Sequence, residues 1–208
     1  MEVLDRILNA AIELFRQYGF KTITMDDIAR RAGISKKTLY QHFANKDEVV
    51  QESVQHFHCH TLEACCGANQ TAANAIDGMI QTMTLLDEMF SKINPMAMLE
   101  LQRYFPKAYE FFQNKMLAQN VSLVRQNIEQ GMAEGYYRDN LNADILAHYR
   151  IEVTRIFFEN STPMMGKYPP YVINRAICEH FLYGLMTPKG EKLYNKLKEN
   201  YQKQAAAL

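Results

Sequence analysis

The sequence predicts an all-α protein. Apolar residues recur at spacings of three and four along most of the 208 residues, and no segment alternates apolar and polar residues as a half-buried strand does. Glycine, proline and helix-capping residues separate these periodic segments. With 48% hydrophobic residues, the chain has enough apolar side chains to bury a sizeable core.

The first predicted helix ends at Gly19, whose backbone tolerates the conformation needed where a helix stops. Its apolar side chains form one stripe, which we expect to pack against the next two helices. The stripe consists of Leu4, Ile7, Leu8, Ala11, Leu14, Phe15 and Tyr18.

A helix-turn-helix is predicted directly after this helix. Thr24 is placed as an N-cap with Asp27 in the capping-box position, so a second helix is expected over residues 25–32. Gly33 provides the turn, and Ser35 caps the third helix.

The third helix is expected to bury one face and expose the others. If Leu39 points inward, Phe43 lies one turn further on beside it, and both belong to the core. The side chains that then face outward are Lys37, Thr38, Tyr40 and Gln41.

Positive charge is concentrated in this segment. Residues 28–46 contain five cations and no Asp or Glu, although the formal net charge of the whole chain is zero. The cations are Arg30, Arg31, Lys36, Lys37 and Lys46. A local basic face favours contact with phosphate, whereas zero net charge argues against the alternative of an architectural protein that coats DNA without a ligand.

The rest of the chain is also predicted to be helical. Asn45 and Glu48 repeat the capping pattern, so a connector helix is expected to start near Lys46 and to run toward Glu63. Loops are expected over residues 65–75 and 161–170. The remaining helices are expected over residues 75–93, 95–104, 106–134, 143–160, 171–186 and 189–204, with Pro95 and Pro106 in first turns.

The segments AIELFRQYGF and TITMDDIARRAGISKKTLYQHFANKDEVV resemble the tetracycline-repressor (TetR) family of bacterial transcription regulators. A complete three-helix frame is a more specific signal than a lone helix-turn-helix. The resemblance implies a DNA-binding domain, placed at residues 1–46, followed by a helical effector-binding and dimerisation domain, placed at residues 47–208. Because the larger part resembles the family only in length and helical character, the resemblance does not imply a particular ligand.

By this resemblance, the third helix enters the major groove of double-stranded DNA. The residues that it places against bases or backbone are Lys36, Lys37, Thr38, Tyr40 and His42, and those that match phosphate contacts are Thr24 and Lys46. Elementary chemistry agrees, because lysine reaches guanine acceptors and hydroxyl groups donate to phosphate. The alternative for Lys36 and Lys37 is a solvated surface.

An effector pocket is expected in the region of residues 96–116, where methionine and aromatic side chains are dense. With two polar residues that could orient a ligand, the candidate ligand-binding residues are Met98, Gln102, Tyr104, Phe105, Tyr109, Phe112, Met116 and Arg125. Ordinary helix core is the alternative for the apolar ones. The effector itself is expected to be small and largely apolar or aromatic.

A homodimer is expected, because one recognition helix reads few base pairs and two-fold proteins read palindromic operators. The candidate interface lies on the last two long helices, and the alternative is that their apolar stripes face their own core. The candidate residues are Ile145, Tyr149, Val153, Ile156, Val172, Ile173, Ala176, Ile177, Phe181 and Leu185.

A metal- or thiol-responsive regulator is the alternative function. One face of the connector helix carries His56, Cys59, His60 and Glu63, a spacing that suits zinc, copper or nickel, and the adjacent Cys65 and Cys66 follow. No second, distant cluster of ligands completes a tetrahedral site, so we expect no metal and no cofactor.

The sequence contains no phosphate-binding glycine loop, nucleophile elbow or paired-carboxylate motif, so an enzyme is not expected. The first residues do not form a signal peptide, and no apolar run reaches the roughly 18 residues of a membrane span. We therefore expect a cytoplasmic DNA-binding regulator, a repressor that an unidentified small-molecule effector releases from a palindromic operator.

Overall fold

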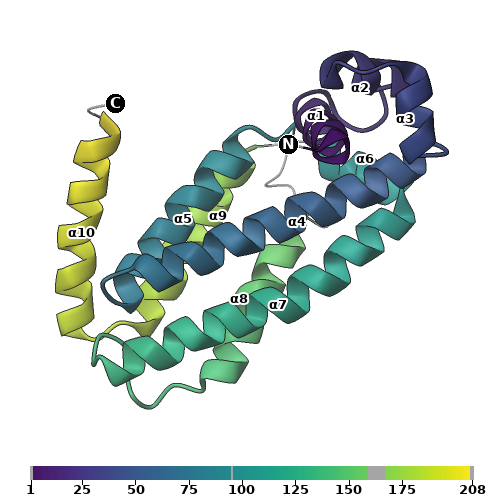
Figure 1. Ribbon diagram of the computed structural model, residues 1–208. Helices are drawn as coiled ribbons and strands as arrows, with labels where there is room; N and C mark the ends of the chain where they lie inside the picture. The colour runs from purple at the N-terminus through teal and green to yellow at the C-terminus, as the bar shows by residue number, and fades with distance from the viewer. Residues whose placement is uncertain (1, 95, 159–166, 207–208) are drawn as a thin grey trace.

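The computed structural model describes residues 2–94, 96–158 and 167–206, without the side chains of residues 90, 116–118, 156–158, 170 and 202–206. Within these ranges the structure is all-α (Figure 1). The helices are α1 (Val3–Tyr18), α2 (Met25–Ala32), α3 (Lys36–His42), α4 (Lys46–Thr71), α5 (Ala75–Ser91), α6 (Ala97–Tyr104), α7 (Pro106–Ala133), α8 (Ala143–Phe158), α9 (Pro170–Leu185) and α10 (Pro188–Ala206).

The first three helices form a small domain at one end of the molecule, above the first turns of α4 (Figure 1). Their apolar faces meet in one core, in which Ile7, Ile28 and Leu39 are fully buried. The first half of α4 joins this core through Val49 and Val50. The predicted stripe on the first helix is confirmed at Ile7, Leu8, Ala11 and Phe15, which are buried on one face, but it is wrong at its two ends, where Leu4 and Tyr18 are exposed.

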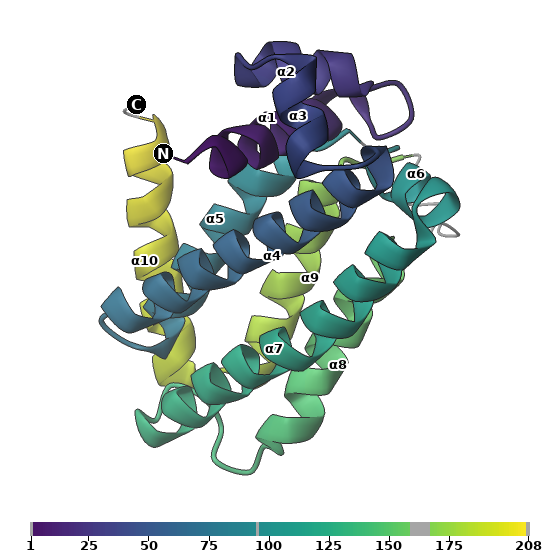
Figure 2. The ribbon, with the colours of Figure 1, turned by 45° about the vertical axis from the view of Figure 1, so that its right-hand side comes forward.

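The remaining helices form a larger domain with its own core. The long helices α4 and α7 cross the molecule beside each other, α8 and α9 lie behind them, and α10 lies at the edge against α5 (Figure 2). This second core contains Ile76, Ile128 and Leu182, all fully buried. The predicted division at residue 46 falls in the first turn of α4, which belongs to both domains.

The two cores are not independent. Leu101 of α6 and Ala108 of α7 are buried in the core of the small domain rather than in that of the large one. At the opposite end, an isolated antiparallel bridge joins Tyr137 to Met186 and holds the α7–α8 connection against the α9–α10 turn. The small domain is therefore seated on α6 and the start of α7.

The loop predicted for residues 65–75 is largely wrong. α4 continues without a break to Thr71, and only residues 72–74 separate it from α5. Gly67 has an ordinary backbone conformation, and the burial of Cys65 beside it favours a continuous helix although Cys and Asn have low intrinsic helix propensity. The short loop ends where Asn74 accepts a hydrogen bond from the Asp77 backbone N–H at 3.0 Å.

Pro106 occupies the first turn of α7, as predicted. Pro95 lies outside the described residues, as do residues 159–166, which include most of the loop predicted over 161–170. None of the described helices has an apolar stretch of the length that a bilayer requires.

Candidate nucleic-acid interface and ligand cavity

Local capping fixes the helix-turn-helix. The Thr24 hydroxyl accepts from the Asp27 backbone N–H at 3.2 Å, and the Asp27 carboxylate accepts from the Thr24 backbone N–H at 3.0 Å. The Thr24 hydroxyl also donates to the Asp27 carboxylate at 2.6 Å, and this bond, together with the one from the Thr24 backbone N–H, holds the pKa of Asp27 below its usual range. Gly33 has a φ of 66°, the left-handed conformation that glycine adopts without strain. The Ser35 hydroxyl accepts from the Thr38 backbone N–H at 3.0 Å and starts α3.

α3 divides into a buried and an exposed face, as predicted. Leu39 is fully buried and Phe43 is 4% exposed. On the opposite side Tyr40 is 52% exposed, and Lys36, Lys37 and His42 are exposed beside it. Thr38 is half-buried, and its hydroxyl lies 2.8 Å from that of Ser35. The exposed face of α3 is therefore basic and carries hydrogen-bonding groups.

Carboxylates from neighbouring segments partly neutralise the positive charge of this surface, so it is less basic than the composition of residues 28–46 indicates. Three of the five cations form ion pairs with carboxylates outside residues 28–46. The pairs are Arg30 with Asp27, Arg31 with Glu13, and Lys36 with Asp26. Such exposed pairs contribute under about 1 kcal/mol, so DNA phosphates can displace the carboxylates. Lys37 has no carboxylate partner among the described residues.

Lys46 lies between the two domains. Its ammonium group donates to the carbonyl oxygens of Phe20 and Lys21, and it sits 5.6 Å from the ring centre of Phe105. Burial lowers the pKa of Lys46, while the nearby Glu100 carboxylate opposes this shift. The side chain predicted to contact phosphate is thus engaged with the turn between α1 and α2.

Further polar contacts fasten the same turn to the large domain. The Glu100 carboxylate accepts from the Lys21 backbone N–H at 2.9 Å. The Arg16 guanidinium donates to the Met89 carbonyl at 2.7 Å, and the Asn94 backbone N–H donates to the Arg16 carbonyl at 2.7 Å. These hydrogen bonds connect the C-terminal end of α1 and the following turn directly to α5 and α6.

A cavity of about 140 Å³ lies inside the large domain, enclosed by α4, α5, α7, α8 and α9. Its wall is mainly apolar and rich in methionine and leucine. The second half of α4 supplies one side of the wall, through Phe57, His58, Thr61, Leu62, Cys65 and Asn69. The helix that directly follows α3 thus borders the interior space.

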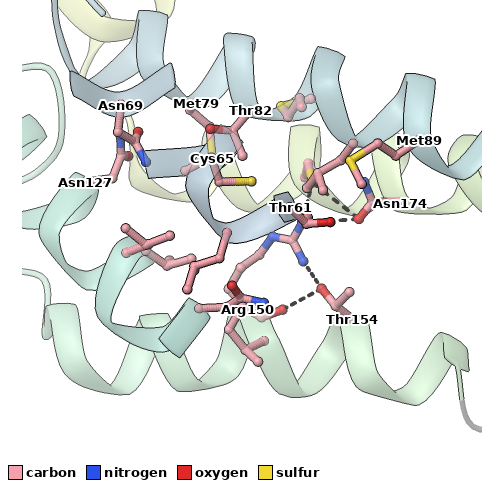
Figure 3. Close-up of a pocket in the computed structure, with 18 of the residues that line it drawn as sticks. Thr61, Cys65, Asn69, Met79, Thr82, Met89, Asn127, Arg150, Thr154 and Asn174 are labelled. Atoms are coloured by element: carbon pink, nitrogen blue, oxygen red, sulfur yellow. Dashed lines mark hydrogen bonds between the residues drawn. The ribbon is translucent and has the colours of Figure 1, made fainter. Parts of the chain in front are cut away.

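Arg150 brings a positive charge to this cavity. Its side chain rises from α8 toward α9 (Figure 3), and the residue is only 7% exposed. The guanidinium donates to the Thr154 hydroxyl, to the Asn174 side-chain oxygen at 3.3 Å and to the Cys178 sulfur. Burial raises the pKa of the Cys178 thiol, and Arg150 opposes that shift.

Of the ligand-binding residues predicted from the sequence, Phe112 lines this cavity. The apolar residues Met98, Phe105 and Tyr109 pack instead against the core of the small domain. The exposed ones are Gln102, Tyr104 and Arg125, and the guanidinium of Arg125 pairs with Glu129 and Asp144. The side chain of Met116 lies outside the described residues. The predicted methionine and aromatic wall therefore joins the domains rather than enclosing a cavity.

Sequence reasoning missed Arg150, Asn174 and Thr82 as cavity residues. The sequence did contain a sign of this interior site: Arg150 lies between Ala147 and Ile151, two residues of the buried stripe of α8. Asn174 similarly follows the buried Ile173 on α9. A charged or amide side chain inside an apolar stripe indicates an interior polar site more directly than aromatic density does.

The predicted dimer residues fall into two groups. Exposed side chains lie along α8 and α9 at Ile145, Tyr149, Val172 and Ala176, with Val153 and Ile177 half-buried beside them. The inclusion of Ile173, Phe181 and Leu185 is wrong for an exposed stripe, because these residues are buried in the chain's own core. The side chain of Ile156 lies outside the described residues.

The histidine and cysteine segment of α4 is dispersed. Cys59 and His60 are exposed. His56 is half-buried, and its Nε2 atom has no hydrogen-bond partner. The ring centres of His56 and His60 lie 5.4 Å apart. In the described part of the chain, no three His, Cys, Asp or Glu side chains, Glu63 included, converge as metal ligands would. Cys65 is buried, which raises the pKa of its thiol to about 11.

Residues 7–52 match the family model described as bacterial regulatory proteins, tetR family. The chain is 34% identical over 77 residues to IcaR of Staphylococcus epidermidis, a negative transcriptional regulator of the biofilm operon icaADBC. That match covers 37% of this chain and 41% of the relative, so it spans less than half of the relative's length. The uncharacterized regulator YvaF of Bacillus subtilis is 23% identical over 182 residues, 86% of this chain and 94% of that protein.

Solved structures share the whole fold. A TetR-family regulator from Agrobacterium tumefaciens superimposes with a TM-score of 0.69 at 14% identity, covering 89% of this chain and 98% of that one. The regulator FadR of Bacillus subtilis, in complex with stearoyl-CoA, gives a TM-score of 0.62 at 16% identity, covering 87% and 98%. At such identities the likeness concerns the arrangement of helices, while the family-model match concerns the helix-turn-helix itself.

Proposed function

Because the chain belongs to the TetR family of bacterial transcriptional regulators, we propose that it is a homodimeric repressor released from a palindromic operator by a small molecule. The effector occupies the cavity enclosed by α4, α5, α7, α8 and α9 in each subunit. The protein acts in the cytoplasm, where its DNA lies. The negative regulation named for the Staphylococcus relative supports repression rather than activation.

The course of α4 is the observation that carries this proposal. Only residues 43–45 separate α3 from α4, and the first half of α4 is buried against the small domain. Its second half forms one side of the cavity wall. A ligand that changes the spacing of this wall also changes the position of α4, and with it the position of α3.

A coupling free energy links effector binding to operator binding and limits how strongly one can affect the other. The effector weakens operator binding only as far as it prefers one arrangement of α4 over the other. By linkage, the operator must weaken effector binding by the same factor. The contacts of Lys46 and Glu100 with the turn between α1 and α2 make the small domain follow the large one.

DNA contact is assigned to the exposed side of α3. Lys37 and Lys36 reach base edges or phosphates in the major groove, Tyr40 and His42 lie beside the backbone, and Thr38 contributes its hydroxyl or methyl group. Thr24 presents the positive end of α2 to a phosphate. Lys46 acts at the domain junction, where its ammonium group has carbonyl partners.

Dimerisation is assigned to the exposed stripe of α8 and α9. Ile145, Tyr149 and Val172 are 63%, 53% and 38% exposed, which is unusual for large apolar side chains on neighbouring helices. Two copies of this stripe, related by a two-fold axis, would form a four-helix contact. Two α3 helices then read two half-sites of a palindrome.

The proposal is tested by selecting sequences from a pool of random double-stranded DNA with the purified protein. Enrichment of a palindrome with half-sites about one helical turn apart is expected. Enrichment of no sequence, or of sites without two-fold symmetry, would contradict the proposed repressor dimer.

Lys37→Ala is expected to weaken binding to the selected site by about tenfold, because it removes an unpaired cation from the reading face. The matched control is Lys196→Ala, which removes an exposed lysine from α10. Fluorescence anisotropy with labelled DNA measures both affinities. Equal losses for the two variants would remove the assignment of α3.

A further inference from the structure

The buried Arg150 lacks an acidic partner. Among the described residues no carboxylate forms an ion pair with it, and its bonded partners are a hydroxyl, an amide oxygen and a thiol. The guanidinium of arginine brings a permanent positive charge into this interior. Buried charges are normally paired, and an unpaired one marks a place where a partner of opposite charge is missing.

Two acidic residues, Asp87 and Glu179, act on the Cys178 thiol through their charge, but both form ion pairs with other cations. Asp87 of α5 pairs with Arg175 at 3.0 Å. Glu179 of α9 accepts from Lys198 at 2.6 Å and from the Tyr194 hydroxyl at 3.1 Å. Neither Asp87 nor Glu179 lines the cavity, and the described wall contains no carboxylate at all. The cavity therefore presents a positive charge without a negative one.

Two further polar groups of the wall have no hydrogen-bond partner. The Nδ2 atom of Asn174, a residue only 7% exposed, and the buried hydroxyl oxygen of Thr82 are both unsatisfied. Both residues line the same cavity as Arg150 (Figure 3). An unmade hydrogen bond in the interior is costly, so these donors point to an acceptor that the ligand supplies. An anion with two oxygens offers acceptors to the guanidinium and to at least one of these donors.

The rest of the wall favours an apolar body behind this anion. Its apolar members are Phe57, Leu62, Met79, Met83, Leu86 and Met89, among others. The volume of about 140 Å³ is close to that of a cavity that accepts benzene. Methionine side chains adapt to ligands of somewhat different shape, so a short aliphatic chain fits as well as a ring.

We propose that the effector is a small monocarboxylic acid whose carboxylate binds Arg150 and whose apolar body fills the methionine-lined part of the cavity. The regulatory meaning of this site rests on the proposed function, but the binding does not. A carboxylate is favoured over a phosphate ester because the wall offers one cation and neutral donors, whereas phosphate groups usually gather several cations or a helix N-terminus. The charge-assisted hydrogen bonds to Arg150 supply the selectivity for an acid over a neutral analogue.

Isothermal titration calorimetry on the full-length protein, without DNA, tests this proposal. The probes are benzoate, hexanoate and octanoate, each paired with its primary amide, together with inorganic phosphate. We expect at least one acid to bind about tenfold or more tightly than its amide. Equal binding of acid and amide, binding of no acid in the series, or tighter binding of inorganic phosphate than of every acid would overturn the proposal.

Variants locate the anion site. Arg150→Met keeps an unbranched apolar stem but removes the guanidinium, and it should abolish the preference for the acid over the amide. Arg150→Lys keeps the charge and should retain part of that preference. The control is Arg155→Met on the same helix, where the guanidinium bonds Glu152 at 2.8 Å, and it should leave the preference unchanged. If Arg155→Met removed the preference as completely as Arg150→Met, Arg150 would not be the anion-binding residue.

A separate measurement distinguishes this inference from the proposed function. The best-binding acid is added to the complex of the protein with its selected DNA, and release is followed by anisotropy. Release supports the acid as effector, and it should be lost in Arg150→Met while DNA affinity without ligand is kept. Tight acid binding without release would refute the effector role proposed for this cavity, yet leave both the DNA-binding assignment and the carboxylate site standing.

Discussion

At the scale of single residues, Arg150 determines how the ligand-free protein is expected to behave. Its guanidinium is buried with neutral partners only, and a site prepared for a ligand commonly lowers the stability of the protein that carries it. The capping residues Thr24, Ser35 and Asn45 were predictable, because each acts on a backbone group three residues away. Two of the three partners of Arg150, Asn174 and Cys178, lie on the next helix, 24 and 28 residues away, which is beyond the reach of a capping or periodicity pattern.

Arg150→Met is expected to raise the free energy of unfolding of the ligand-free protein by about 1 to 3 kcal/mol, because an unbranched apolar side chain replaces an uncompensated buried charge. Urea unfolding followed by circular dichroism measures the change. Arg155→Met is the control and should shift stability by less than about 1 kcal/mol, since it loses a partly exposed ion pair. A clear loss of stability in Arg150→Met would mean that its neutral partners already satisfy the guanidinium.

At the scale of helices, the sequence predicted the type of every described element and most boundaries to within a few residues. Periodicity and caps act locally, so they identify α1 to α3 almost residue by residue. The loop prediction is wrong over residues 65–71, because small and polar residues are typical of loops but here belong to α4. Tertiary packing decided otherwise, since Cys65 is buried there and the helix borders the cavity.

Two glycines inside helices should respond to the same substitution with opposite signs. A Cβ at Gly67 of α4 would meet no atom within 4 Å, so Gly67→Ala should stabilise the protein by about 0.5 to 1 kcal/mol through reduced backbone entropy of the unfolded chain. At Gly131 of α7 a Cβ would overlap the ring of Tyr137, which is fully buried, so Gly131→Ala should destabilise by about 1 to 3 kcal/mol. Urea midpoints at one fixed protein concentration provide the comparison, and a neutral Gly67→Ala would argue that residues 65–71 are not helical.

At the scale of the whole molecule, the sequence predicted the architecture better than the interior site. The helix-turn-helix lies in one continuous segment, so the buried and exposed faces of α3 could be predicted from residue spacing alone. The cavity draws on five helices, and each of them supplies at least one polar residue to its wall. The predicted wall around Phe105 and Tyr109 is apolar in composition, but it packs against the small domain instead.

Tyr149→Glu is expected to convert the dimer to a monomer, because it places a charge in the middle of the exposed apolar stripe of α8 and α9. Size-exclusion chromatography with light scattering would then report about the mass of one chain, 24.1 kDa. Tyr104→Glu on α6 is the control, since Tyr104 is similarly exposed at 42% and lies outside the stripe. A wild-type protein that elutes as a monomer at micromolar concentration would refute the interface.

Because α4 is one unbroken helix, a tilt about its C-terminal end moves its N-terminal end further than it moves the residues in the cavity wall. Its 26 residues span about 39 Å at roughly 1.5 Å per residue. A tilt of about 5° around Thr71 shifts Leu62, in the cavity wall, by only about 1 Å, but shifts Lys46 by roughly 3 Å. In a symmetric dimer the two displacements combine to about 6 Å, set against a half-site spacing of about 34 Å. A ligand no larger than benzoate therefore has to move its wall by less than a bond length to spoil the fit of two recognition helices on DNA.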